Sequence, residues 1–343
     1  MRLTGKKALV TGATGFIGGR LAERLKKEEN AEVRTLVRSP EKARSLASIG
    51  IEIVEGDVTD PTSVRRAMAG CSLAFHCAAL MHDAGATFEG FRQVNVGGTA
   101  NVLDAATDAG IELLVYISSI AVYGIDPKAH TDETGLFRTT GIPYSDSKIE
   151  AERLVYRHAE RTNLPLVIIR PANVYGPRSS FWTLGLLTMI DAGRLTLIDD
   201  GSGKSNHLYI DNLVDAILAA ARTDSAVNED FIISDGAETP WSEFLGHYAK
   251  MAGRSSLPSI SLTRAKCRAF LSEFGTRVVG GTPRLTRIEV RCWTQSGIFD
   301  ISKARRVLNY APRVSLNEGM KKTEHWLREI GHIARASSAR GKS

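Results

Sequence analysis

Short apolar segments alternate with helix-like segments in the first half of this 343-residue chain, and a glycine-rich turn follows the first of them. Together they predict an α/β fold, a Rossmann-type doubly wound parallel sheet with a smaller C-terminal lobe. Near-continuous apolar strands are typical of parallel sheets that helices cover on both faces. After about residue 170 this alternation fades, and the lobe is predicted to begin there.

The predicted strands are short and apolar, and longer helix-like segments separate them. We expect strands at 7–11, 32–37, 52–55, 73–77, 113–118 and 166–170, and helices that include 17–27, 61–69, 94–109 and 145–161. Residues 171–330 are predicted to form most of the lobe. The small, polar and basic residues 331–343 are predicted to form a flexible tail.

The turn at 11–18 reads Thr-Gly-Ala-Thr-Gly-Phe-Ile-Gly, which has the spacing of a dinucleotide-binding turn. Gly12 permits the turn, Gly15 lets backbone N–H groups approach a pyrophosphate, and Gly18 lets the helix lie close to the strand. The positive end of the helix dipole also attracts phosphate. We therefore predict that residues 1–170, with a later segment of about 205–235, bind a dinucleotide. The contacts from the turn would be Gly12, Thr14, Gly15, Phe16, Ile17 and Gly18.

Tyr144 and Lys148 stand four residues apart in a predicted helix, so their side chains share one face. A phenol with the ordinary pKa of about 10 is a weak base at neutral pH, but a nearby ammonium lowers that pKa. Such a phenol can exchange a proton with a substrate hydroxyl while a hydride moves to or from a nicotinamide. Downstream of a dinucleotide-binding turn, the spacing predicts a catalytic pair.

The composition is that of a soluble globular protein, with 43% hydrophobic and 24% charged residues. The four cysteines have no metal-ligand spacing and are too few for a disulfide framework, so we expect no metal and a reduced, cytoplasmic setting. The first residues read as strand, turn and helix rather than as a signal sequence. Since no apolar run reaches the roughly 18 residues that span a bilayer, we expect no integral membrane segment.

The net charge of +6 is concentrated between Arg254 and Cys292, where eight basic residues stand against Glu273 and Glu289. This stretch is either a solvated basic face or a site for an anionic substrate or an acidic surface. Nucleic acid is not expected as a partner, because stacking aromatic residues do not interleave with the basic ones. Within the stretch, residues 264–274 mix basic and apolar side chains. They form either a lid helix packed on the core or a surface that touches a membrane and collects a lipid-like substrate.

With these motifs the chain resembles the extended short-chain dehydrogenase/reductase family, the NAD-dependent epimerase/dehydratase superfamily, from about residue 6 to residue 330. It looks nearest to the 3β-hydroxysteroid dehydrogenase and dihydroflavonol reductase branch. The family places a Ser or Thr just after the fifth strand, where this chain reads Ile-Ser-Ser-Ile-Ala-Val-Tyr-Gly. The resemblance implies that Ser119 holds the substrate oxygen, with Ser118 as the alternative. It also implies that Tyr144 and Lys148 are catalytic and that Lys148 holds the nicotinamide ribose.

The resemblance assigns further residues. Asp57, with Val58 beside it, would reach the adenine, and Asn173 would face the substrate. His76 is a candidate acid or base, but we expect it to have a packing role instead. Asn95 resembles an asparagine of the family whose role is mostly structural. The remaining cofactor contacts that the resemblance implies are Cys77, Ala78, Ala79 and Pro171.

The end of the second predicted strand bears on the choice of cofactor. In the NAD-preferring pattern an acidic residue stands there and binds the ribose hydroxyls. Here Arg38 occupies that place, and a guanidinium can fork onto a 2′-phosphate. We therefore expect NADP(H) to be preferred, with NAD(H) possible and with Lys42 or Arg44 assisting. The alternative is an ordinary surface arginine.

Two departures from the family's patterns limit the reactions that we expect this chain to catalyse. Dehydratases carry Asp-Glu directly after the catalytic hydroxyl, but residues 120–121 are Ile-Ala and the acidic pair at 132–133 lies too far along. Nucleotide-sugar epimerases usually place an Arg in the loop where residues 204–206 are Lys-Ser-Asn. We expect net interconversion of a secondary alcohol and a ketone, on a small-molecule substrate and as a possible homodimer. Epimerisation through a transient keto sugar is the first alternative, and a non-catalytic sensor or scaffold the second.

Overall fold

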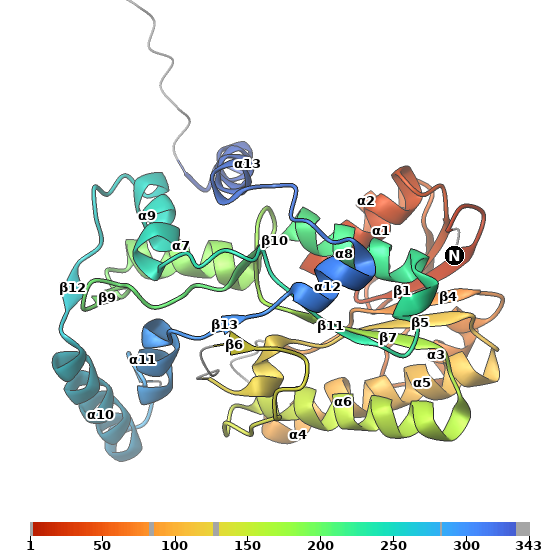
Figure 1. The fold of residues 1–343 in the computed structure, drawn as a ribbon, viewed down its shortest axis with the longest axis horizontal. Coiled ribbons are helices and arrows are strands. Elements are labelled where there is room, and N and C mark those ends of the chain that lie inside the picture. Colours follow the sequence, from red (N-terminus) through yellow and green to blue (C-terminus); the bar gives the residue numbers. More distant parts are fainter. Residues whose placement is uncertain (1–2, 82–85, 126–129, 282, 334–343) are drawn as a thin grey trace, which may run out of the picture. The chain divides into compact units, whose positions relative to one another are not determined.

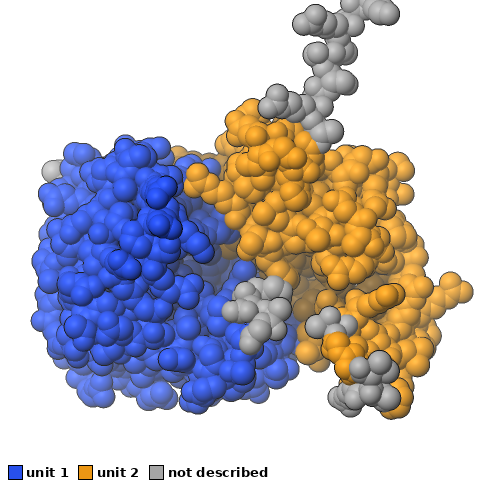
Figure 2. All heavy atoms as spheres, turned by 180° about the vertical axis from the view of Figure 1, so that it is seen from behind, with its two compact units in different colours: residues 1–172, 210–236, 297–312 blue, residues 173–209, 237–296, 313–343 orange. Residues whose placement is uncertain are grey.

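The computed structural model describes residues 3–81, 86–125, 130–281 and 283–333. It divides into two compact units, coloured blue and orange in Figure 2. The first comprises 1–172, 210–236 and 297–312, and the second 173–209, 237–296 and 313–343. Segment 297–312 differs from the expected division. It joins the first unit because its strand β13 (Ile298–Phe299) pairs with β6 (His130–Thr131). The predicted tail lies, from residue 334 on, outside the described residues.

The first unit contains a sheet of seven parallel strands in the order β11-β7-β5-β4-β1-β2-β3. The order runs outward in both directions from β1 and β4, so the predicted doubly wound class is confirmed. The predicted strands all form, and β11, which was not predicted, adds an edge strand beside β7. The bounds are β1 Lys7–Thr11, β2 Glu32–Val37, β3 Glu52–Glu55, β4 Leu73–His76, β5 Leu113–Ile117, β7 Leu166–Pro171 and β11 Asp230–Ile233.

Helices cover both faces of this sheet, which is why a central strand such as β5 is buried along its whole length. Figure 1 shows α1 (Phe16–Lys27) and α8 (Ile210–Arg222) on one face and α3 (Pro61–Met68), α5 (Gly98–Asp108) and α6 (Pro143–Thr162) on the other. The shorter helices of this unit are α2 Arg44–Ala47, α4 Phe88–Arg92, α12 Ser302–Leu308, and the single turns η1 Pro40–Ala43, η2 Gln93–Gly97, η3 Ile120–Tyr123 and η5 Asp224–Ala226.

The second unit is built on aromatic side chains rather than on a large sheet. Trp241, Phe244 and Tyr248 of α9 (Trp241–Met251) are buried, and Tyr175 packs edge-on against Phe244. Among the described residues of this unit, the strands form the short parallel pairs β8 with β10 and β9 with β12. The bounds are β8 Asn173–Tyr175, η4 Ser180–Gly185, α7 Leu186–Asp191, β9 Leu197–Ile198, β10 His207–Tyr209, β12 Ser259–Ile260, α10 Leu262–Val279, α11 Arg287–Thr294 and α13 Leu316–Glu329.

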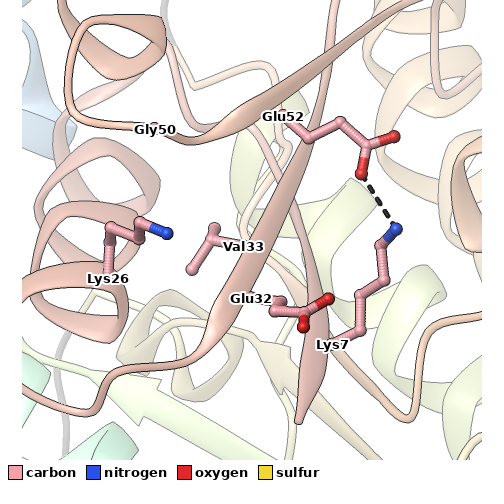
Figure 3. A pocket seen from close by; sticks show the side chains of 6 residues that line it. All are labelled: Lys7, Lys26, Glu32, Val33, Gly50 and Glu52. Atoms are coloured by element: carbon pink, nitrogen blue, oxygen red, sulfur yellow. Dashed lines mark ion pairs between the residues drawn. The ribbon is translucent and has the colours of Figure 1, made fainter. Parts of the chain in front are cut away.

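A small cavity of about 170 Å³ lies beside the strands β1, β2 and β3 (Figure 3). Lys7, Glu32 and Glu52, which line it, are the first residues of these strands. Lys7 and Glu52 form an ion pair of 2.9 Å across it. The cavity is therefore at the amino ends of the strands, whereas doubly wound sheets bind their ligands at the carboxyl ends.

Candidate active site

The glycine turn lies at the carboxyl end of β1 and is closely packed. Gly12 has a φ of +71°, and a Cβ there would lie 2.7 Å from the amide nitrogen of Ala78. A Cβ at Gly18 would lie 2.5 Å from the carbonyl oxygen of Gly12. Both positions therefore require glycine. Gly15 is the N-cap residue of α1, and both Thr14 and Gly15 are exposed. These residues fit a dinucleotide, because backbone N–H groups at a helix start remain accessible to its phosphates.

Other residues predicted to hold the cofactor follow the carboxyl ends of neighbouring strands. Arg38 comes directly after β2 and is exposed. Asp57 follows β3, and its carboxylate accepts hydrogen bonds from the amide and hydroxyl of Thr59 at 2.9 and 3.0 Å. Cys77 follows β4, and burial raises the pKa of its thiol to about 12. Residues placed in this way belong to one edge of the sheet. The remaining predicted residues there are Phe16, Ile17, Val58, Ala78, Ala79 and Pro171.

Helix α6 carries Tyr144 and Lys148 near its start, which Pro143 occupies as a favourable first residue. Tyr144 is partly buried, and Lys148 is buried. Burial raises the pKa of Tyr144, and a hydrogen bond with Ser119 acts in the opposite direction. The expected lowering of this pKa by Lys148 is therefore not found. Ser119 and Tyr144, which are distant in the sequence, are brought together.

Lys148 is held by oxygens of β5. Its ammonium donates to the hydroxyl of Tyr116 at 3.0 Å and to the carbonyl of Ile117 at 2.7 Å. Burial lowers the pKa of Lys148 to about 8, although the carboxylate of Glu152 opposes the shift. Tyr116 is not among the residues predicted from the sequence. Its one signal in the sequence is a hydroxyl-bearing side chain at the penultimate position of an otherwise apolar strand.

A chain of buried side chains continues behind Tyr116. The phenol is hydrogen-bonded to Thr99, whose hydroxyl lies 3.0 Å from Nε2 of His76. Nδ1 of His76 lies 2.7 Å from the hydroxyl of Thr11, the last residue of β1. Burial lowers the pKa of His76 to about 3, so the ring is neutral. These contacts favour the expected packing role of His76 over acid–base chemistry.

The two neighbouring serines have different partners. The hydroxyl of Ser118 donates to the buried carboxylate of Glu152, which also binds Arg170. Ser119 caps η3, where its hydroxyl accepts a hydrogen bond of 3.1 Å from the amide of Ala121. Of the two, Ser119 is the serine that meets Tyr144.

Asn173, the predicted substrate residue, lies in the second unit. Its carboxamide donates to the carbonyl of Ser205 at 2.7 Å, and its backbone amide to that of Asn206 at 3.0 Å. Lys204 forms an ion pair of 3.4 Å with Glu238. The polar groups of this loop are thus bonded within the second unit.

The described residues contain no group of three or more His, Cys, Asp or Glu side chains placed to hold a metal ion. None of the described helices combines the length and the apolar character that a bilayer crossing requires.

A doubly wound sheet with this glycine turn and a Tyr-x-x-x-Lys helix defines the class of extended short-chain dehydrogenases/reductases. The comparison with family models gives the particular family. The model described as "NAD dependent epimerase/dehydratase family" matches residues 8–234, and the chain belongs to this family. It is therefore an enzyme, an NAD-dependent oxidoreductase or epimerase.

Similar proteins include a 4-hydroxy-2-methyl-3-oxo-4-farnesyl-3,4-dihydroquinoline-1-oxide ketoreductase of Stigmatella aurantiaca, 30% identical over 92% of this chain and 94% of the relative. A decarboxylating sterol-4-alpha-carboxylate 3-dehydrogenase of Saccharomyces cerevisiae is 28% identical over 94% and 97%. A UDP-glucose 4-epimerase of Vibrio cholerae is 28% identical over 93% and 94%. The predicted 3β-hydroxysteroid dehydrogenase-like branch is confirmed by such relatives.

Among solved structures, a UDP-glucuronic acid 4-epimerase from Bacillus cereus in complex with NAD has the same fold, with a TM-score of 0.76. It is 22% identical, and the match covers 94% of this chain and 99% of the epimerase.

Proposed function

We propose that the protein interconverts a secondary alcohol and a ketone by hydride transfer, with Ser119, Tyr144 and Lys148 as its catalytic residues. The observation that carries this proposal is the hydrogen bond between Ser119 and Tyr144, one helical turn before Lys148. Two hydroxyls that meet in this way can bind one substrate oxygen between them. A nicotinamide dinucleotide, held by the glycine turn, supplies the hydride acceptor or donor when it is bound.

In this proposal Ser119 orients the substrate oxygen and Tyr144 exchanges the proton. The raised pKa of Tyr144 keeps its phenol protonated at neutral pH. A protonated phenol is the form that reduction of a ketone requires, because it donates its proton as the carbonyl oxygen gains charge. Lys148, one helical turn further along α6, would contribute the positive charge that stabilises this developing negative charge.

We further propose a lipophilic substrate. Relatives of this chain are named for a farnesyl quinoline oxide and for a sterol carboxylate, both largely apolar molecules. Epimerisation of a nucleotide sugar is the second candidate, favoured by the UDP-glucose 4-epimerase relative. Against it, the loop at 204–206 lacks the arginine that the epimerase pattern usually places there.

The test is a single absorbance experiment at the band of the reduced nicotinamide, with candidate ketones or alcohols in excess. We expect stoichiometric consumption or production of NADPH. Tyr144→Phe should lower turnover by roughly 10²–10⁴-fold while dinucleotide binding is kept. Near wild-type turnover in this variant would refute the mechanism. Inversion of a stereocentre without net change in cofactor would favour the epimerase.

The preference for NADP(H) is a second part of the proposal and depends on Arg38, which is exposed at the end of β2. Loss of a charge-assisted phosphate contact typically costs about 1.5–3 kcal/mol, or roughly ten- to a hundredfold in affinity. Arg38→Ala should weaken NADPH binding by that amount and leave NADH binding unchanged. Equal affinity of the wild type for both cofactors would contradict the assignment.

A further inference from the structure

Helix α10 has two apolar faces. The inner face, formed by Leu262, Ala265 and Ala269, packs in a small core with Val290 of α11. Ala265 and Ala269 are fully buried there. Figure 1 shows α10 and α11 lying beside each other. The inner face alone explains how α10 is attached to its unit, so the second apolar face needs another explanation.

The outer face of α10 consists of Cys267, Phe270, Leu271 and Phe274, at the i, i+3, i+4, i+7 spacing of one helical stripe. Their exposure is high: Phe270 is 57% exposed, Leu271 65% and Phe274 59%. The rings of Phe270 and Phe274 stack on each other with centroids 6.4 Å apart. A cluster of large apolar side chains on one exposed stripe is typical of an interaction surface, because isolated exposed apolar residues are what a protein surface normally shows.

Basic side chains border this stripe. By helical periodicity Arg264 and Arg268 lie along one edge of the outer face and Lys266 along the other, and all three are exposed. The two acidic residues of the stretch are engaged elsewhere. Glu273 forms an ion pair of 2.7 Å with Arg287, and Glu289 closes a capping box at the start of α11. The outer face is thus apolar at its centre and positively charged at its edges.

We propose that the outer face of α10 binds the surface of an anionic lipid membrane. The helix would lie in the plane of the interface, with Phe270, Leu271 and Phe274 among the upper acyl carbons. The long stems of Arg264 and Arg268 would reach back to the lipid phosphates. A second copy of this chain fits less well. A twofold interface places the same patch on both sides, so it would bring these like charges together.

The experiment is sedimentation of the full chain with vesicles of phosphatidylcholine alone or mixed in equal parts with phosphatidylglycerol. We expect binding to the mixed vesicles. The double variant Phe270→Ser/Phe274→Ser should bind roughly tenfold more weakly. The triple variant Arg264→Gln/Lys266→Gln/Arg268→Gln should lose the preference for the anionic lipid and show a weaker dependence on salt. This binding does not depend on the proposed reaction, so turnover is not its readout.

A matched control is the double variant Phe88→Ser/Leu136→Ser, which removes two exposed apolar side chains from the other unit, 44% and 77% exposed. It should bind vesicles as the wild type does, and the melting temperature of each variant checks folding. Absence of wild-type binding, or equal loss in the control, would overturn the proposal. So would a dimer in sedimentation velocity that Phe270→Ser/Phe274→Ser converts to monomer, because a second copy would then cover this face.

Discussion

Two buried cations of the first unit, Arg170 on β7 and Lys148 on α6, are almost equally hidden from water, at 1% and 2% exposure. Their surroundings differ. Arg170 binds the carboxylates of Glu152 and Asp230, each with a contact of 2.6 Å. Lys148 donates to two uncharged oxygens, those of Tyr116 and Ile117.

The pKa values of the two cations shift in opposite directions because their partners differ. Burial works against the charge of Arg170, but the carboxylates outweigh it and raise its pKa above the ordinary value. Burial prevails at Lys148 and lowers its pKa to about 8. Glu152 stands one turn from Lys148 on α6, yet its carboxylate binds Arg170 and Ser118. Removing a cation that is bonded to buried carboxylates leaves unpaired charge and destabilises the fold. A buried cation without a directly bonded carboxylate is instead the kind of group that functional sites retain.

The largest effect is expected for Arg170→Met. The substitution leaves the fully buried Glu152 without its cation, while Asp230 keeps its ion pair with Lys303. Breaking a buried ion pair in this way typically costs about 3–5 kcal/mol in the free energy of unfolding. The midpoint of urea denaturation measures it. Arg92→Met is the control: Arg92 and its partner Glu150 form an exposed ion pair, so the midpoint should not move. An unchanged midpoint in Arg170→Met would remove the distinction between the two cations.

The same substitution at the other cation, Lys148→Met, should leave the free energy of unfolding at neutral pH within about 1 kcal/mol, because removing an uncompensated buried charge offsets the lost hydrogen bonds. Turnover should fall by roughly 10²-fold or more.

The folded pKa of Lys148, about 8, lies below the ordinary 10.5. Between these two pH values the unfolded chain binds more protons at this residue than the folded protein does. The free energy of unfolding of the wild type therefore increases as the pH rises through this range. The variant should lack that gain. A stability loss equal to that of Arg170→Met would contradict this prediction.

The smallest effect is expected for Tyr116→Phe, which removes one acceptor from the ammonium of Lys148 and keeps the ring. The charged form is then less stabilised, so the pKa of Lys148 should fall further below its present value of about 8. The alkaline limb of the pH–rate profile for ketone reduction should move to lower pH, with KM little changed. Tyr156→Phe, beside Arg170, is the control and should leave the limb in place.

Local patterns were sufficient to predict the doubly wound sheet. The strands β1, β2 and β3 have the predicted bounds, because apolar runs and glycine turns mark them within a few residues. The strand β11 was missed, since it is short and comes after a stretch without regular alternation. In the second unit the core is aromatic and its strand pairs are short, so the sequence carries little periodicity to read.

At the site, the glycine turn and the Tyr-x-x-x-Lys spacing lie within single segments and could be predicted. The partners of Arg170 could not, because Glu152 and Asp230 come from separate elements that only the folded sheet brings together. The direction of the pKa shift at Tyr144 depends on burial, which the spacing of two residues does not reveal. The catalytic and cofactor roles, a homodimer and a cytoplasmic location stay predictions.

Each unit is assembled from three separated segments of the chain, and this has a consequence for synthesis on the ribosome. The first unit lacks the edge strand β11 until residue 233 has been made, and α12, which packs against β11 and α8, until residue 308. A nascent chain released after residue 172 would expose the edge of β7 to other chains. We therefore expect the first unit to complete its folding late in translation. Until then the exposed edge of β7 must be protected from other chains.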